Sequence, residues 1–126
     1  MAINSKQKGA AGEREWAKFC REHGYQDCRR TAQYCGNTGD ASDVVGLAGI
    51  YQEVKRVERL NLENAMEQAS RDSAALDDLP IVAHRKNRRE WMVTMWAEDW
   101  FALYDAWNKE RYEKRDEDDT ESVPAP

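Results

Sequence analysis

The sequence lacks long apolar runs, and no stretch approaches the roughly 20 apolar residues that a membrane-spanning helix needs. The N-terminal residues also lack the apolar segment of a signal peptide, so we expect a cytoplasmic protein with no membrane association. Hydrophobic residues make up 40% and charged residues 34% of the 126 positions. This composition is typical of a soluble globular domain with one core.

Cysteine is also scarce, and the chain contains only Cys20, Cys28 and Cys35. An odd number in a chain without an export signal indicates reduced thiols rather than a disulfide framework. Together with His23 they offer four potential zinc ligands. However, no spacing is Cys-x-x-Cys, and Cys20 falls on the apolar face of a predicted helix, so zinc is the less favoured interpretation.

Positive charge is in deficit, since the net charge is −5. Residues 113–126 hold six acids and two bases, a net of −4, which leaves only −1 for residues 1–112. We predict a globular domain over 1–112 and a disordered acidic tail over 113–126. Acidity of this distribution does not exclude DNA as a ligand.

Hydrophobic periodicity predicts three helices, over 6–23, 62–76 and 98–111, and five strands, over 29–31, 43–46, 50–56, 81–84 and 91–95. Gly46 to Gly49 should close a hairpin, and Asn61 should cap the second helix. Residues 33–42 read as a loop, in which Asp40 either contacts a metal or forms an Asx turn. The order indicates an α/β fold with a mixed central sheet of about five strands flanked by helices. The second helix is long enough to connect parallel strands.

One carboxylate of the first predicted helix occupies an unusual position. Glu13 lies near the centre of the face made by Ala10, Trp16, Ala17 and Cys20. A carboxylate on a buried face is costly unless something positive meets it. Two interpretations remain open: a structural salt bridge, for example to Arg29 or Arg30, or a ligand of a metal or DNA site.

The predicted strand over 50–56 carries a second pair of charges. Side chains two apart share one face, so Glu53 and Lys55 should point the same way and Val54 oppositely. Asp43 begins the preceding strand and should face Glu53 through the hairpin. Two carboxylates and an amine would then converge, a donor set suited to Mg²⁺. The alternative is an exposed cross-strand ion pair.

The combination of these features resembles a known family. Its motif residues here are Lys8-Gly9-Ala10-Ala11-Gly12-Glu13-Arg14-Glu15, Ser42-Asp43-Val44-Val45-Gly46 and Gln52-Glu53-Val54-Lys55. The chain resembles the PD-(D/E)xK nuclease superfamily, and in detail the archaeal-type and phage-encoded Holliday junction resolvases, over roughly residues 8–104. Ser42 stands where the motif has proline, a position that shapes a turn and ligates nothing.

The resemblance implies a restriction-endonuclease-like sheet and a Mg²⁺-dependent cut of branched DNA, with Mn²⁺ as a substitute. It implies catalytic roles for Glu13, Asp43, Glu53 and Lys55, with Mg²⁺ held by the three carboxylates and the Val54 carbonyl. Alternatives are a nuclease of the same fold acting on flaps, nicked or linear duplex, and a non-catalytic DNA-binding module. Related resolvases act as two-fold dimers, so a homodimer is expected. A phage origin would place the chain in the bacterial host cytoplasm.

Several further residues are candidates for DNA contact. Four bases fall within five residues of the predicted turn between the last two strands, and others lie near the first helix and strand: Lys8, Arg29, Arg30, Arg85, Lys86, Arg88 and Arg89. Such contacts position DNA without reading its sequence. Gln68, at the edge of the second helix, is either a polar helper of the site or a surface residue. The aromatic residues of the last helix should be mostly core, with an excess that suits a subunit interface.

Overall fold

The computed structural model describes residues 5–31 and 43–122, and the side chains of 9–31 and 43–116. The predicted loop over 33–42, with Cys35 and Asp40, lies outside the described residues. The chain divides into two compact units, Met1–Met95 and Trp96–Pro126. Each unit is described by itself.

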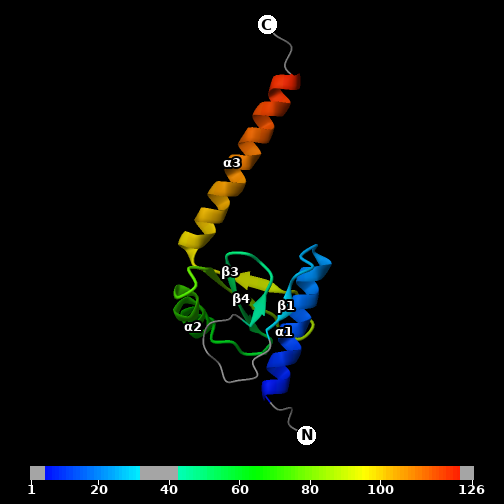
Figure 1. Cartoon of the computed structure of the whole chain (residues 1–126), viewed down its shortest axis with the longest axis vertical. Coiled ribbons are helices and arrows are strands. Elements are labelled where there is room, and N and C mark those ends of the chain that lie inside the picture. The colour runs from blue at the N-terminus through cyan, green and yellow to red at the C-terminus, as the bar shows by residue number, and fades with distance from the viewer. Residues whose placement is uncertain (1–4, 32–42, 123–126) are drawn as a thin grey trace. The chain divides into compact units, whose positions relative to one another are not determined.

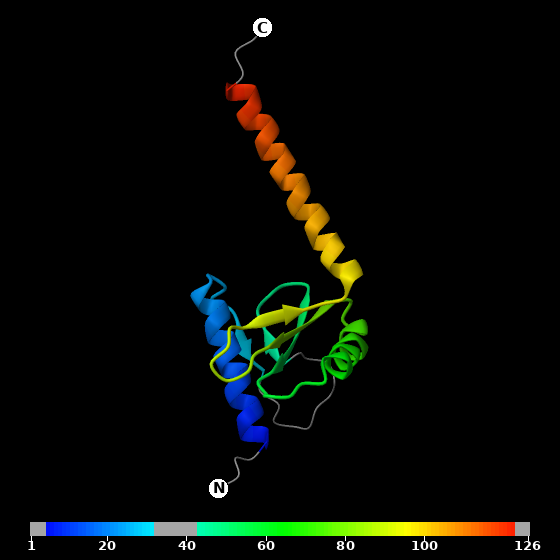
Figure 2. The same cartoon turned by 180° about the vertical axis from the view of Figure 1, so that it is seen from behind.

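The first unit is built around a five-stranded sheet whose strands follow one another in chain order. They are β1 (Arg29–Arg30), β2 (Val44–Val45), β3 (Ile50–Lys55), β4 (Leu79–His84) and β5 (Met92–Thr94). Strands β3 and β4 are parallel and the other neighbours antiparallel. Helix α2 (Leu62–Ala74) makes the parallel connection (Figures 1 and 2). The predicted mixed α/β sheet and its crossover helix are confirmed.

Helices α1 (Ser5–Glu22) and α2 cover opposite faces of this sheet. One buried cluster joins α1 to the strands through Trp16, Ala17, Cys20, Val44, Val54 and Ala83. A second cluster joins α2 to them through Tyr51, Val82, Ala65, Met66 and Ala69. Because side chains alternate along a strand, β3 directs its even-numbered residues towards α1 and its odd-numbered residues towards α2. Glu53 and Lys55 therefore belong to the α2 face.

Helix α1 is held very close to the end of β3. A Cβ added to Gly12 would lie 2.5 Å from the Arg56 Cβ, so only glycine permits this approach. One turn further on, the Trp16 Nε1–H donates to the Gln52 Oε1 at 2.8 Å, inside the protein. The helix ends as predicted before Gly24, whose φ of +100° suits a glycine. These contacts fix where α1 places its charged residues.

Strand β4 begins at Leu79, earlier than the predicted strand over 81–84, and includes Pro80. The Leu79 N–H donates to the Gly49 carbonyl, on the side of β3. Because backbone groups of successive residues point to opposite sides of a strand, the backbone nitrogen of Pro80 faces the side of β5. Strand β5 pairs only with Val82 to His84. The missing N–H of Pro80 therefore costs no ladder hydrogen bond, which is why proline is tolerated there.

The second unit is dominated by helix α3 (Ala97–Ser122). The helix continues past the predicted end at Arg111, so part of the segment expected to be a disordered tail is helical. The domain limit at residue 112 stays a prediction. The aromatic residues expected to be mostly core are exposed, with Trp100 at 49%, Phe101 at 56% and Trp107 at 51%. Over the described ranges, none of the helices has the length and apolar character needed to cross a membrane.

Candidate active site

Asp43 and Glu53 are brought together by the β2–β3 hairpin. Val44 is the partner of Gln52 in the antiparallel ladder, which sets Asp43 opposite Glu53 on the same face. The Val54 N–H donates to the Asp43 Oδ2 at 3.1 Å and fixes that carboxylate. Glu53 is only 4% exposed. The predicted meeting of these two carboxyl groups is present in the structure.

The pair has an excess of negative charge in a poorly solvated place. Burial, and then the neighbouring Asp43 charge, raise the pKa of Glu53 to about 8. Burial also raises the pKa of Asp43, although the Val54 N–H and a hydrogen bond from Glu53 oppose this change. Two carboxylates this close hold one proton between them when no cation is present. The raised pKa values of both groups agree with a proton shared by Asp43 and Glu53.

Lys55 is the positive group nearest to this pair. Its Nζ lies 3.5 Å from the Glu53 Oε1, and 32% of the lysine side chain is exposed. When both carboxyl groups are ionised, one ammonium group leaves the site net negative, which favours binding of a cation in place of the shared proton.

Glu13 is engaged by an arginine. The Arg30 Nε donates to the Glu13 Oε2 at 2.5 Å, and the Glu13 side chain is 17% exposed. Burial, and then the Asp43 charge, raise the pKa of Glu13, while Arg30 lowers it. Arg30 is paired in the sheet with Val44, the neighbour of Asp43. Of the two interpretations open for Glu13, the structure contains the ion pair, placed beside the Asp43–Glu53 pair.

These residues suit a divalent cation by their charge and by the type of their donor atoms. Within the described residues, 5–31 and 43–122, no group of three His, Cys, Asp or Glu side chains could hold a metal ion. Glu13 therefore does not complete a three-acid group with Asp43 and Glu53 in this geometry. The two facing carboxylates still supply oxygen ligands, and Mg²⁺ commonly uses one or two of these plus waters. A cation there would replace the shared proton.

The cysteines do not favour zinc. Cys20 and Cys28 are buried free thiols. Burial, and then the neighbouring Cys28 thiol, raise the pKa of Cys20 to about 12, which opposes the thiolate that zinc requires. The His23 Nδ1 lies 2.8 Å from the Phe19 carbonyl.

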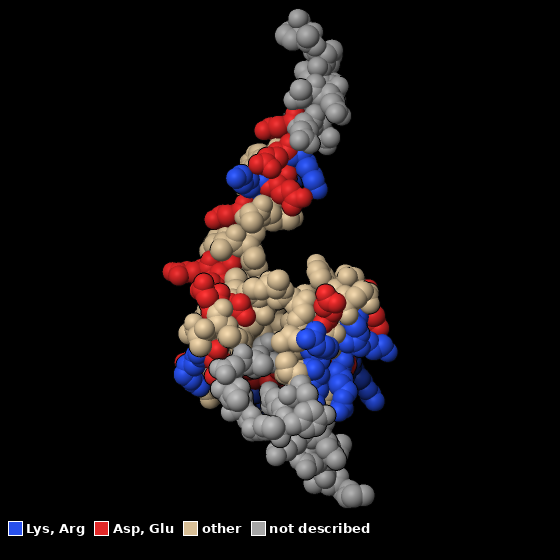
Figure 3. Space-filling view, in the orientation of Figure 1, with Lys and Arg blue, Asp and Glu red and all other residues tan. Residues whose placement is uncertain are grey.

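The candidate DNA contacts divide into paired and exposed residues. Arg85 donates from Nη1 to the Glu15 Oε1 and lies over the Trp91 ring, 6.0 Å from its centroid. Arg30 is paired with Glu13, as described above. In contrast, Arg29, Lys86, Arg88 and Arg89 are exposed. The side chain of Lys8 lies outside the described part. In Figure 3 the Lys and Arg side chains gather over the region of α1.

The Arg85 pair belongs to a second charge cluster that the sequence did not reveal. The Arg56 Nε lies 3.2 Å from the other Glu15 carboxylate oxygen, and its Nη1 donates to the Asn87 Oδ1 at 2.9 Å. One carboxylate thus meets two guanidinium groups. This cluster ties α1 to the residues that follow β3 and β4.

A cavity of about 290 Å³ opens beside Lys55. Gln68 lines it and is also exposed, so its role as a polar helper of the site stays a prediction. Arg59, Asn61 and Asn64 also line it and were missed from the sequence. The sequence indicates these residues only weakly: the four-residue spacing of Asn64 and Gln68 places two carboxamides on one side of α2.

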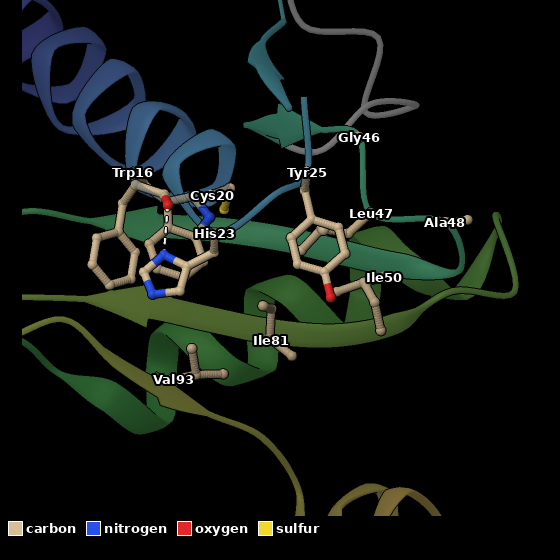
Figure 4. A pocket seen from close by; sticks show the side chains of 11 residues that line it. Trp16, Cys20, His23, Tyr25, Gly46, Leu47, Ala48, Ile50, Ile81 and Val93 are labelled. Atoms are coloured by element: carbon tan, nitrogen blue, oxygen red, sulfur yellow. Dashed lines mark hydrogen bonds between the residues drawn. The ribbon is translucent and has the colours of Figure 1, made fainter. Parts of the chain in front are cut away.

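A larger cavity, of about 710 Å³, lies on the opposite face of the sheet. Figure 4 shows Trp16 and Cys20 of α1, with His23 just after the helix, on one side of it and Ile81 and Val93 of the sheet on the other. No acidic side chain lines it. It is therefore separate from the carboxylate site, and its lining is suited to apolar contacts rather than to hydrolysis.

The fold and the paired carboxylates are typical of nucleases that have a mixed sheet and an acidic centre. Comparison with known proteins agrees with this class. A sequence profile of the family described as "Phage putative PDDEXK endonuclease" matches residues 4–122. The chain belongs to this family of PDDEXK nucleases. The resemblance predicted from the motif residues is thereby confirmed at the level of the family.

A solved structure shares the fold. It is Hjc of Archaeoglobus fulgidus, a Holliday junction resolvase from an archaeal hyperthermophile, which matches with a TM-score of 0.53 and 19% identity. The match covers 69% of this chain and 76% of that chain. At this identity the likeness establishes the restriction-endonuclease-like fold. No sequence match was found among curated proteins.

Proposed function

We propose that this protein is a metal-dependent endonuclease that hydrolyses phosphodiester bonds of branched DNA, with the four-way junction as its preferred substrate. The observation that carries the proposal is the Asp43–Glu53 pair with Lys55 beside it. Two carboxyl groups that must share a proton are unfavourable for stability, and a cation site gives a reason for them. The likeness to Hjc supports the junction as substrate.

In this proposal each residue has a distinct task. Asp43, Glu53 and the Val54 carbonyl would hold Mg²⁺, or Mn²⁺ in its place, and Glu13 would complete the site directly or through water. The ion would supply a Lewis acid and a more acidic water molecule. Lys55 would orient the attacking water in line with the phosphorus. The P–O3′ bond breaks, and the products carry a 5′-phosphate and a 3′-hydroxyl.

The Glu13–Arg30 pair gives Glu13 a second state. While Arg30 holds Glu13, the Glu13 side chain is 17% exposed and its carboxylate is bound to the guanidinium. A phosphate arriving at the site offers Arg30 a stronger partner for bidentate hydrogen bonds. Exchange of Arg30 from Glu13 to phosphate would then release the carboxylate towards the cation. Glu13 could thus form the observed ion pair with Arg30 and still take the role at the cation that the family motif implies.

The test offers labelled four-way junctions, flaps, nicked duplex and linear duplex to the full chain in Mg²⁺, with Ca²⁺ as a control that does not support cutting. Paired symmetric nicks in the junction, with the fastest rate there, are the expected result. Faster cutting of flaps, nicked or linear duplex would favour the alternative nuclease of the same fold. Tight DNA binding without cutting in Mg²⁺ or Mn²⁺ would favour a non-catalytic module.

Two symmetric cuts in one junction require two active sites, so we propose a homodimer. The exposed aromatic residues of α3 offer apolar area for self-association, since an exposed patch of this kind marks an interaction surface. Light scattering at micromolar concentration should give twice the chain mass. A monomeric mass on DNA as well as in solution would contradict this part of the proposal. A phage-encoded enzyme would act in the host cytoplasm.

A further inference from the structure

The cavity beside Lys55 has a lining that no motif accounts for. Lys55 and Arg59 contribute positive charge, and Asn61, Asn64 and Gln68 contribute carboxamides. None of its lining residues is acidic, although α2 carries Glu63 and Glu67. Since Lys55 belongs both to this cavity and to the carboxylate site, the two are adjacent.

The polar groups of the cavity match the chemistry of a nucleotide. A carboxamide presents a donor and an acceptor side by side, which is the arrangement that pairs with base edges. Asn64 and Gln68 are separated by one helical turn of α2 and both are exposed. Arg59 and Lys55 suit phosphate oxygens. Val57, Leu60 and Ala65 provide the apolar part of the wall.

The size of the cavity limits the ligand. About 290 Å³ is at the lower end of small-molecule sites, so one nucleotide fits and a base-paired duplex does not. A nucleotide must leave the stack to enter, and this costs least where the base is already unpaired, as at a branch point. No aromatic residue lines the cavity, so hydrogen bonds rather than stacking would hold the base.

We propose that this cavity is a subsite for one unpaired nucleotide next to the phosphate that is cut, with Asn64 and Gln68 binding the base edge and Arg59 a flanking phosphate. The inference rests on the proposed function and deepens it. It makes the cavity the place where the enzyme distinguishes a branch point from continuous duplex, and it gives α2 a part in substrate choice.

The experiment uses the full chain and its Asn64→Ala/Gln68→Ala double variant, with Glu63→Gln as the matched control on the same helix. Branched DNA carries either 2-aminopurine or an abasic sugar at the nucleotide beside the cut. On 2-aminopurine DNA the double variant should raise KM about tenfold or more and leave kcat within a few-fold, since one good bidentate pair is worth ~1–3 kcal/mol. On abasic DNA the parent and the double variant should be equal.

A second readout does not depend on cutting. In Ca²⁺, the fluorescence of 2-aminopurine should change on binding to the parent and to Glu63→Gln, and the change should be lost in the double variant. Free deoxyadenosine monophosphate, added as competitor, distinguishes a site for a free nucleotide from one that accepts only a nucleotide within DNA. Equal KM values and equal fluorescence for parent and double variant would overturn the subsite. If the parent cuts no DNA but the fluorescence result holds, the proposed hydrolysis fails and the subsite remains.

Discussion

Two charge clusters lie near the end of strand β3, and they are built in opposite ways. In one, the single carboxylate of Glu15 meets the guanidinium groups of Arg56 and Arg85. In the other, the two carboxyl groups of Asp43 and Glu53 meet a single ammonium group. The first sets opposite charges against each other, whereas the second buries two carboxyl groups that repel each other when both are ionised. The difference indicates that the first cluster serves the fold and that the second is suited to binding a cation.

We expect the largest effect from removing one of the two facing carboxylates. Glu53→Gln keeps the side-chain shape but removes one ligand, so we expect the cleavage rate to fall about a thousandfold, since the bound cation supplies several kcal/mol of transition-state stabilisation. The metal-free protein should be as stable as the parent or more stable, because the repulsion with Asp43 is gone. Single-turnover cleavage and thermal melting measure the two effects. A variant that cuts at the parental rate would disprove the role of Glu53.

The close approach of α1 holds both clusters in place. Gly12→Ala would put a Cβ 2.5 Å from the Arg56 Cβ, so the helix must shift. Overpacking of this kind costs about 1–3 kcal/mol, and we expect that loss in urea unfolding. Gly9→Ala is the matched control, since nothing lies within 4 Å of its added Cβ. It should stabilise by about 0.5–1 kcal/mol through helix propensity. Equal effects of the two substitutions would contradict the close contact.

Breaking the Glu15–Arg56–Arg85 cluster should lower the free energy of unfolding and leave the cleavage rate nearly unchanged. Glu15→Gln leaves two arginines without a carboxylate, and because the Glu15 side chain is 36% exposed we expect a loss of only about 1 kcal/mol. The cleavage rate at saturating Mg²⁺ and DNA should stay within a few-fold of the parent. Denaturant titration and single-turnover kinetics give the two values. A large loss of rate with unchanged stability would show that Glu15 belongs to the site after all.

The Asp43–Glu53 pair should also affect the pH dependence of the free energy of unfolding. The pKa of Glu53 is about 8 in the fold against an ordinary value of 4.5, so the folded state binds the extra proton. Its stabilising effect is complete below about pH 4.5 and is lost as pH rises through about 8. The metal-free parent should thus lose stability over this range relative to Glu53→Gln. Parallel stability curves for parent and variant, measured without metal, would contradict the shared proton.

Much of the fold could be predicted from periodicity, but the partners of charged residues could not. Strand parity and the hairpin turn were enough to set Asp43 against Glu53, because both rules act over a few residues. The Glu15–Arg56–Arg85 cluster joins three elements distant in the chain, and no local pattern encodes it. For Glu13, the apolar helix face indicated that a positive partner was needed. Only the packing of β1 against α1 identified that partner as Arg30.

Helix α3 and the cavity beside Lys55 show two other limits. The aromatic residues of α3 were expected to be core because large apolar side chains usually are, yet they are exposed in the structure. The cavity was not foreseen because its lining comes from β3, the segment after it and α2. In the sequence, the polar residues of this lining have no feature that marks them as part of a site. Only the fold shows that they lie next to Lys55.

The central claim is that Asp43 and Glu53 form a cation site in which the metal replaces a shared proton. Calorimetric titration of the DNA-free protein with Mn²⁺ near pH 6.5, repeated in buffers of different ionisation enthalpy, measures both binding and proton release. The account predicts one tight site per chain, close to one proton released per ion, and no such site in Glu53→Gln. Binding of equal affinity to parent and Glu53→Gln, with no proton released, would contradict it.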